Sequence, residues 1–324
     1  VDDNGMSKTY PLYTPTATNS GKLVDGALTQ SCNAVAGRVP VNTTKLACGD
    51  YAVNTIQPFQ QPYSPGTATA KRLPLLTNPT IGDRLNAANV SWAWSSGGWA
   101  NANGDQTSPG WTNGFGPTCY DPAAATSAVY PNCPDKNFQY HHQPLDYYAT
   151  FDASTPSGLA NRTAHLKDEQ VFFQLADAST SSCNLPSVSF VKPIGDENEH
   201  PGYTGETRGS NHLVDLIQAV ENSACARDTM VVVTYDEFGG QWDHVPPPGQ
   251  TGGPAGPSDV WGPGTRIPAL VIAPSIKHTP HLDFAVDDTE HDTTSILATL
   301  EHRYGLSPLS TRDAAVSDLA SALK

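Results

Sequence analysis

The chain has 324 residues and a formal net charge of -14, with 38% hydrophobic and 15% charged residues. The negative charge excludes a nucleic-acid partner, because such a protein needs basic patches to displace the counterions of the phosphates. No apolar run approaches the roughly 18 residues of a transmembrane helix, so no membrane span is expected.

The N-terminal part of the chain has little periodic structure. Residues 1–80 are rich in turns and interrupted by prolines, and they are predicted to cover one edge of a sheet. Residues 81–324 are predicted to form the C-terminal part of an α/β domain. It begins with a helix at 80–89, capped by Thr80, and a strand at 90–94. The Gly-, Trp- and Asn-rich stretch that follows, to about residue 135, is typical of a functional loop or lid.

Strands and helices alternate in the rest of the chain. Helices are predicted at 164–175, at 211–220 with Asn211 as N-cap, and at 293–304 with Gly305 closing the last turn. Further strands are predicted at 187–191, 230–234 and 267–273. This order indicates an α/β fold with a central, mostly parallel sheet between helices. These strands are few for a chain of this size, so the sheet is expected to be incomplete or to have strands hidden in the N-terminal region.

Two adjacent carboxylates follow the strand at 230–234. The run of valines there predicts a strand buried on both faces, and Asp236 and Glu237 stand where it leaves the sheet. Ligands of open α/β sheets bind beyond the carboxyl ends of the strands, so this pair is a candidate for holding a metal or for catalysis. Gly239 and Gly240 would let the backbone turn sharply beside a ligand. The alternative is an acidic turn without chemistry.

Three histidines stand out from the other seven. His141 and His142 are adjacent in an aromatic loop, and His200 follows the strand at 187–191 as Asp236 follows its own. If those two strands are parallel neighbours, His200 and Asp236 reach the same edge of the sheet. Imidazoles beside carboxylates can ligate a metal, bind phosphate or carry protons. The remaining histidines are expected on the surface or in hydrogen bonds: His165, His212, His244, His278, His281, His291 and His302.

A second set of residues is expected to support the loops. Asp243 and His244 can hold their loop through a carboxylate–imidazole hydrogen bond. Arg266, a cation at the start of a strand, is expected in a buried ion pair with a loop acid.

The six cysteines show no C-x-x-C spacing, which disfavours a zinc site. Their even number favours disulfides in an oxidising compartment, and the short local pairs Cys32–Cys48 and Cys119–Cys133 are predicted. The chain is therefore expected to be secreted or periplasmic. A reduced cytosolic chain is the alternative.

Five motifs carry a resemblance to a known family. They are TYDEFGGQWDHVPPP, NEHPGY, YHHQPLDYY, GPGTRIPALVIAPSIKH and HDTTSILATLEHRYGL. Together, over roughly the last two thirds of the chain, they resemble the secreted phosphoesterases that include acid phosphatase A and the phosphocholine-directed phospholipases C. YHHQP and NEHPG point to the acid phosphatase branch. The family is similar in fold to alkaline phosphatases, with a metal-assisted site at the strand ends.

The resemblance implies roles for the residues singled out above. Asp236 and Glu237 would help to hold a divalent metal ion, and His141, His142 and His200 would contact the phosphoryl group. The implied reaction is hydrolysis of phosphate monoesters, with attack by a side-chain nucleophile and charge stabilised by the metal and by imidazolium groups. Oxygen ligands favour Mg, Ca or Mn, and nearby histidines leave Zn and Fe open. The alternatives are a phospholipase C acting on phosphodiesters and a non-catalytic homologue.

Two elements of the family pattern are missing from this sequence: the N-terminal ENRSFD-like motif, which supplies further metal ligands, and the nucleophilic serine. An N-terminal segment that completes the site is then cleaved but still bound, lies outside the chain as printed, or is truly absent. The first two are favoured, because unpaired central strands would be a liability for an isolated chain. A bound N-terminal fragment of the same protein is therefore an expected partner.

Overall fold

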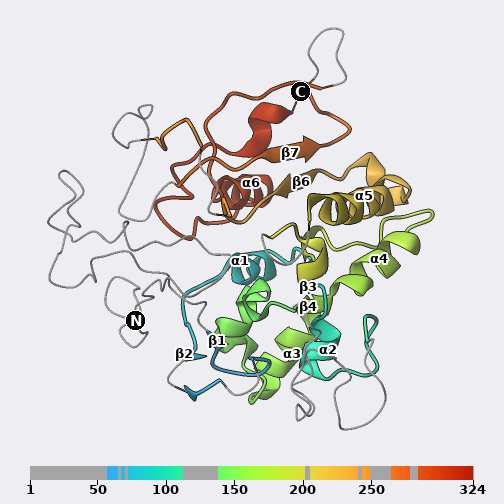
Figure 1. The fold of residues 1–324 in the computed structure, drawn as a ribbon, viewed down its shortest axis with the longest axis vertical. Coiled ribbons are helices and arrows are strands. Elements are labelled where there is room, and N and C mark those ends of the chain that lie inside the picture. Colours follow the sequence, from blue (N-terminus) through green and yellow to red (C-terminus); the bar gives the residue numbers. More distant parts are fainter. Residues whose placement is uncertain are drawn as a thin grey trace, which may run out of the picture.

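The computed structural model describes residues 57–64, 67–69, 72–111, 138–200, 205–239, 243–248, 264–277 and 284–323 (Figure 1). The N-terminal segment predicted at residues 1–80 lies largely outside these ranges, because its residues 1–56 are not described. Within them the chain is a mixed α/β structure with small sheets, in keeping with the predicted α/β class. No helix of the described ranges is both long and apolar enough to cross a membrane.

The central sheet has three parallel strands in the order β4-β3-β5. They are β3 (Trp92–Ser96), β4 (Leu166–Asp168) and β5 (Val188–Lys192). The predicted strands at 90–94 and 187–191 thus form with small shifts, whereas β4 was not predicted. The register pairs Ser96 with Lys192, so β3 and β5 end at the same edge of the sheet.

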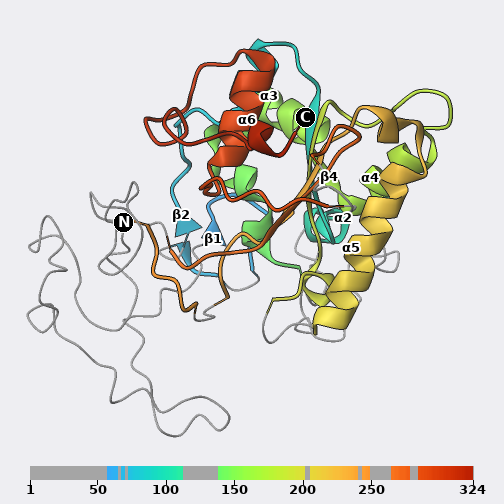
Figure 2. The same ribbon diagram turned by 90° about the horizontal axis from the view of Figure 1, so that it is seen from above.

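Apolar side chains cover both faces of this sheet. On one face Trp92 and Val188 pack with Leu85 and Phe151, and Leu300 joins them from the partly buried rim. A second, smaller cluster contains Phe172, Val220 and Cys225, with Val191 and Val231 packed against it. Figure 2 shows helices α4 and α5 on one side of the strands and α6 on the other. The sheet therefore lies between helices, as predicted.

Two further pairs of strands lie outside the central sheet. β6 (Val231–Thr234) and β7 (Ala269–Ile272) coincide with predicted strands, but they pair antiparallel with each other. β1 (Gln57–Pro58) and β2 (Arg72–Leu73) form a short parallel pair in the N-terminal region. The prediction that β6 is buried on both faces was wrong, because all four of its residues are only half-buried.

Two helices form close to where the sequence predicts them. α1 (Ile81–Ala87) begins at Thr80, and Asp83 completes a capping box in which each side chain accepts from the other residue's backbone N–H. α6 (Ser295–Tyr304) ends at Gly305, whose φ of 64° lies in the left-handed region that glycine adopts without strain. Capping chemistry therefore located these two ends correctly.

Other helices differ from the prediction. The helix expected at 164–175 is divided into α3 (Pro156–His165) and α4 (Glu169–Asp177), because β4 intervenes and Asp168 caps α4. α5 (Glu206–Glu221) begins several residues before Asn211, which is interior and not an N-cap. α2 (Trp99–Asn103) lies in the stretch expected to be a loop; residues 112–137 of that stretch are outside the described ranges.

Six short 3-10 helices complete the secondary structure of the described ranges. They are η4 (Tyr140–His142), η5 (Pro144–Tyr147), η6 (Ala149–Phe151), η7 (Gly195–Glu197), η8 (Ala224–Arg227) and η9 (Leu319–Ala322). η4 lies in the YHHQP motif, and η7 lies just before the NEHPG motif.

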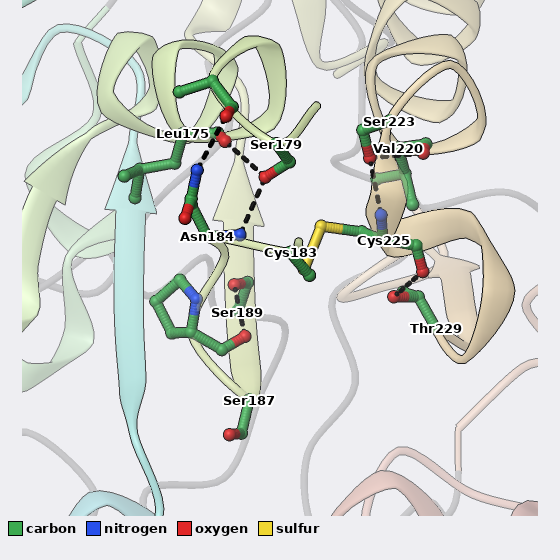
Figure 3. The surroundings of a disulfide bond; sticks show 12 residues. Leu175, Ser179, Cys183, Asn184, Ser187, Ser189, Val220, Ser223, Cys225 and Thr229 are labelled. Atoms are coloured by element: carbon green, nitrogen blue, oxygen red, sulfur yellow. Dashed lines mark hydrogen bonds between the residues drawn. A yellow bond between two sulfur atoms is a disulfide. The ribbon is translucent and has the colours of Figure 1, made fainter. Parts of the chain in front are cut away.

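One disulfide links the loop before β5 to η8 (Figure 3). It joins Cys183 to the fully buried Cys225, with Cα atoms 4.6 Å apart. Ser223 accepts a hydrogen bond from the Cys225 N–H, and the Cys225 carbonyl accepts one from Thr229. The expectation of disulfide chemistry is thus supported, although this pair was not singled out. The predicted pairs Cys32–Cys48 and Cys119–Cys133 lie outside the described residues.

Removing this disulfide is expected to destabilise the fold. The bond closes a loop with a sequence separation of 42. Closing a loop of that length lowers the conformational entropy of the unfolded chain and so stabilises the folded state by roughly 3–4 kcal/mol. The double variant Cys183→Ala, Cys225→Ala should therefore unfold at lower urea concentration, with a steeper dependence on urea because the unfolded chain without the crosslink exposes more surface. An unchanged midpoint would contradict this expectation.

Candidate functional site

The double histidine is held by the central sheet. His141 and His142 end η4, and their rings meet nearly at right angles with centroids 4.6 Å apart. The His142 carbonyl accepts hydrogen bonds from Trp94 Nε1 at 2.7 Å and from Ser96 Oγ at 2.9 Å, both on β3. His142 itself is buried, with 5% of its surface exposed. The end of β3 therefore fixes the backbone from which both imidazoles project.

His200 lies on the loop that leaves β5. The loop begins after Lys192, passes through η7, and reaches His200, whose backbone N–H donates to the Asn198 side chain at 2.9 Å. The His200 ring is partly exposed, and its Nε2 lies 3.6 Å from Glu237 Oε1. The NEHPG histidine thus faces the acidic pair.

Asp236 and Glu237 follow β6 as predicted. Asp236 Oδ2 lies 2.9 Å from the ammonium nitrogen of Lys192, and both carboxylates are largely exposed. Partial desolvation would raise the pKa of Asp236, but the hydrogen bond and charge of Lys192 outweigh it and hold that pKa below its ordinary value. The Asp236 carboxylate is therefore ionised over the whole physiological range.

The five predicted residues converge, though not for the reason given by the sequence. The argument from sequence required β5 and β6 to be parallel neighbours, but β5 pairs with β3 and β6 pairs with β7. The two strand ends meet instead through the Lys192–Asp236 and His200–Glu237 contacts. His141 lies close enough to this cluster for its pKa to be influenced by the charges of four groups: Lys192, Asp236, His200 and Glu237. A cluster of imidazoles and acids thus stands at the carboxyl ends of the strands, where α/β folds bind ligands.

Burial lowers the pKa of both histidines of the pair. Desolvation, followed by the nearby charge of Lys192, lowers the pKa of His142 to about 3. The same two causes lower the pKa of His141, partly offset by Asp236. The expectation that imidazolium groups supply positive charge therefore does not hold for His142. It can offer only a neutral N–H or a lone pair to a ligand.

The depressed pKa of His142 makes stability fall in acid. In the unfolded chain His142 is protonated below about pH 6.5, whereas in the folded chain it is protonated only below about pH 3. The free energy of unfolding therefore decreases as the pH falls from about 6.5 to about 3. Replacing His142 with Gln should reduce the loss between about pH 7 and pH 4.5 by on the order of 2 kcal/mol. Urea unfolding at both pH values measures it. An equally steep loss in the variant would refute the assignment.

Lys192 is the site residue that sequence reasoning missed. It is the last residue of β5 and is mostly buried, with its ammonium beside Asp236 and close enough to lower the pKa of both His141 and His142. A single lysine at a strand end carries no signal by itself. Its position directly after a buried strand, at the same edge as the acidic pair, was the available clue.

The loop after Asp236 is organised largely as expected. Gly239 adopts a φ of 61°, the left-handed conformation predicted for a sharp turn, while Gly240 lies outside the described residues. Asp243 binds Arg266 through two hydrogen bonds of 2.6 and 3.0 Å and lies 3.3 Å from His244 Nδ1. The predicted ion pair of Arg266 exists, but it is not buried, because 57% of the arginine side chain is exposed.

The other histidines of the described ranges have structural partners. His165 stacks on Trp92, His291 lies near Asp287, and His302 pairs with Asp318 at 2.6 Å. His278 and His281 lie outside those ranges. His212 differs from the others, because its two ring nitrogens face two carboxylates.

The expected metal site can be compared with the donors present. Asp236 and Glu237 offer oxygen ligands of the right chemistry, but no third His, Cys, Asp or Glu of the described ranges converges with both of them. The one group there that could hold a metal ion is Glu169, Glu197 and His212, whose ligand atoms lie within 4.8 Å of one another. The described residues thus supply the acidic pair as a partial donor set for a divalent ion.

This combination of carboxylates, imidazoles and an ammonium group at the strand ends of an α/β fold is suited to phosphate esters. A family model described as the phosphoesterase family matches residues 6–307, and the chain therefore belongs to that family of phosphoric ester hydrolases.

Similar curated proteins are phospholipases C. Phospholipase C B of Mycobacterium tuberculosis is 34% identical over 164 residues, which cover 44% of this chain and 30% of the relative. Phospholipase C A of the same organism is 30% identical over 166 residues, covering 45% and 31%. Non-specific phospholipase C6 of Arabidopsis thaliana is 28% identical over 150 residues, covering 40% and 29%. The chain thus spans less than a third of the length of these relatives.

Proposed function

We propose that the chain contributes the strand-end cluster of a phosphodiesterase of the phospholipase C kind. The observation that carries this proposal is the convergence of His141, His200, Lys192 and the acidic pair in a member of the phosphoesterase family. The diester preference rests on the names of the relatives, which are phospholipases C. It replaces the monoester preference expected from the YHHQP and NEHPG motifs as the leading interpretation.

In this proposal, positive charge at the phosphoryl group comes from Lys192. The chain carries a net charge of -14, which repels a phosphate ester, so local cations have to offset that field. Lys192 is the ammonium group already at the strand ends, 2.9 Å from Asp236. His142, neutral at any ordinary pH, orients the ester by hydrogen bonding. His200, partly exposed beside Glu237, exchanges protons with the reacting group.

Asp236 and Glu237 would hold a divalent metal ion together with ligands from outside the described residues. Such an ion supplies charge neutralisation and polarises a phosphoryl oxygen. Mg, Ca or Mn fits a carboxylate donor set best, with Zn or Fe as alternatives. The missing ligands and the nucleophile are proposed to come from an N-terminal segment of the same protein. If so, mass spectrometry of the purified protein under denaturing conditions should reveal that segment, either in the same chain or as a second peptide.

The ratio of two activities tests the substrate class. We expect hydrolysis of a p-nitrophenyl phosphodiester, such as p-nitrophenylphosphorylcholine, to exceed hydrolysis of p-nitrophenyl phosphate in kcat/KM. The reverse ratio would favour the second candidate, a phosphatase acting on monoesters, which the YHHQP and NEHPG motifs support. Activity of the complete protein, N-terminal segment included, on neither ester, with the fold intact and divalent ions supplied, would favour a non-catalytic homologue.

The proposed location is outside the cytoplasm, in a secreted or periplasmic compartment. The Cys183–Cys225 disulfide supports it, since such bonds persist in oxidising compartments.

A further inference from the structure

His212 lies between two carboxylates from different parts of the fold. Its Nε2 is 2.9 Å from Glu169 Oε1, in the first turn of α4, and its Nδ1 is 3.4 Å from Glu197 Oε2, the last residue of η7. Glu169 is buried, with 3% of its side chain exposed, and His212 is nearly so at 11%. A carboxylate at this depth requires a partner that can bear positive charge or donate a hydrogen bond.

The two contacts use opposite edges of the ring. The ligand atoms of the three residues lie within 4.8 Å of one another, so a metal ion could bind all three, but it would use only one ring nitrogen of His212. An imidazolium has an N–H on each nitrogen, so it can donate to Glu169 and present its positive charge to Glu197. Burial opposes protonation of His212, but Glu169, Glu197 and Asp215 together outweigh it and raise its pKa. The ring of Phe173 packs nearly at right angles to that of His212, with centroids 5.9 Å apart.

The same stretch is fastened to α5 a second time. Glu199 accepts a hydrogen bond from Ser210 Oγ at 2.9 Å and another from the Tyr235 hydroxyl. Gly209 faces Glu199 so closely that no Cβ atom would fit between them. Residues 193–200, which connect Lys192 to His200, are therefore held against α5 on both sides of Asn198.

We propose that His212 is a positioning residue, an imidazolium that clamps η7 between α4 and α5 and so sets where His200 stands. This inference deepens the proposed function, since it explains how the phosphoesterase site keeps its third histidine in place. The clamp is complete while His212 is protonated and opens as the pH rises through the pKa of the folded protein.

Hydrogen exchange of residues 193–200 tests the clamp without any turnover. In His212→Gln, which keeps a hydrogen-bonding group but loses the charge, exchange of this segment should rise roughly ten-fold or more, since a hydrogen bond to a charged group is worth at least that factor. Glu197→Gln should act in the same direction. His302→Gln is the matched control, because it removes an exposed histidine–carboxylate pair elsewhere.

Two further measurements separate this clamp from ordinary packing. Corrected for its intrinsic pH dependence, exchange of 193–200 in the unmodified protein should accelerate above neutral pH, and His212→Gln should abolish that acceleration. Unchanged exchange in Glu197→Gln and His212→Gln would overturn the proposal. The proposal would also be overturned if adding Zn²⁺ slowed this exchange in the unmodified protein but not in His212→Gln. A metal ion would then hold Glu169, Glu197 and His212 together. If His212→Gln does not fold, the result for Glu197→Gln decides.

Discussion

Replacing Asp236 with Asn is expected to lower kcat/KM for the preferred phosphate ester by about 100-fold or more, the loss usual for a group that stabilises charge in the transition state. The change removes the carboxylate beside Lys192 and one of the two acidic metal donors proposed above. Steady-state kinetics with saturating divalent ion measures the effect. The protein should still fold, because 61% of the Asp236 side chain is exposed and such substitutions alter stability by about 0.5 kcal/mol or less.

Asp228→Asn provides the control for this experiment. Asp228 is an exposed aspartate in the connection between α5 and β6, so the same change of charge is made away from the strand ends. Its activity should equal that of the unmodified protein. Full activity in Asp236→Asn would remove the acidic pair from the catalytic site and leave it as a surface turn.

Replacing Arg162 with Met is expected to destabilise the fold by roughly 3–5 kcal/mol, the usual cost of leaving a buried charge without its partner. Arg162 forms an ion pair with Asp146, and the two side chains are 5% and 1% exposed. It also donates to the Gln61 carbonyl at 2.8 Å and to Asn103 at 3.1 Å. Burial raises the pKa of Asp146, and Arg162 opposes that rise. Urea unfolding measures the loss.

Arg227→Met, at an exposed position in η8, is the control and should leave the free energy of unfolding nearly unchanged. A double variant, Asp146→Leu with Arg162→Met, should recover part of the loss, since a pair of apolar residues leaves no charge uncompensated. Equal stability of Arg162→Met and Arg227→Met would show that the ion pair contributes nothing. Asp146 follows the double histidine by four residues, so this loss should also disturb the site.

Several structural features that depend on residues adjacent in sequence were predicted correctly. The capping box of Thr80 and Asp83 located α1, and Gly305 located the end of α6. The position of β6 was predicted correctly for the same reason, because a run of valines favours a strand without any distant partner. The left-handed turn at Gly239 belongs to this group too.

Features that depend on distant partners were missed or misassigned. β4 has only three residues, and its Leu-Lys-Asp sequence becomes a strand because β3 pairs with it. The first turns of α5 contact Glu199 and Glu197 through Ser210 and His212, and no spacing within the helix reveals these contacts. The role of His212 was hidden in the same way, since Glu169 lies 43 residues away in sequence. The antiparallel pairing of β6 with β7 is likewise a choice between distant partners.

The disulfide has a practical consequence for anyone handling the protein. Cys183 and Cys225 enclose β5, η7 and α5, and with them both Lys192 and His200. A protease that cuts within this span would leave the two pieces covalently joined, so they would migrate as one band on a gel run without reductant. Comparison of reduced and unreduced samples is therefore needed before an inactive preparation is attributed to its chemistry and not to a nick beside His200.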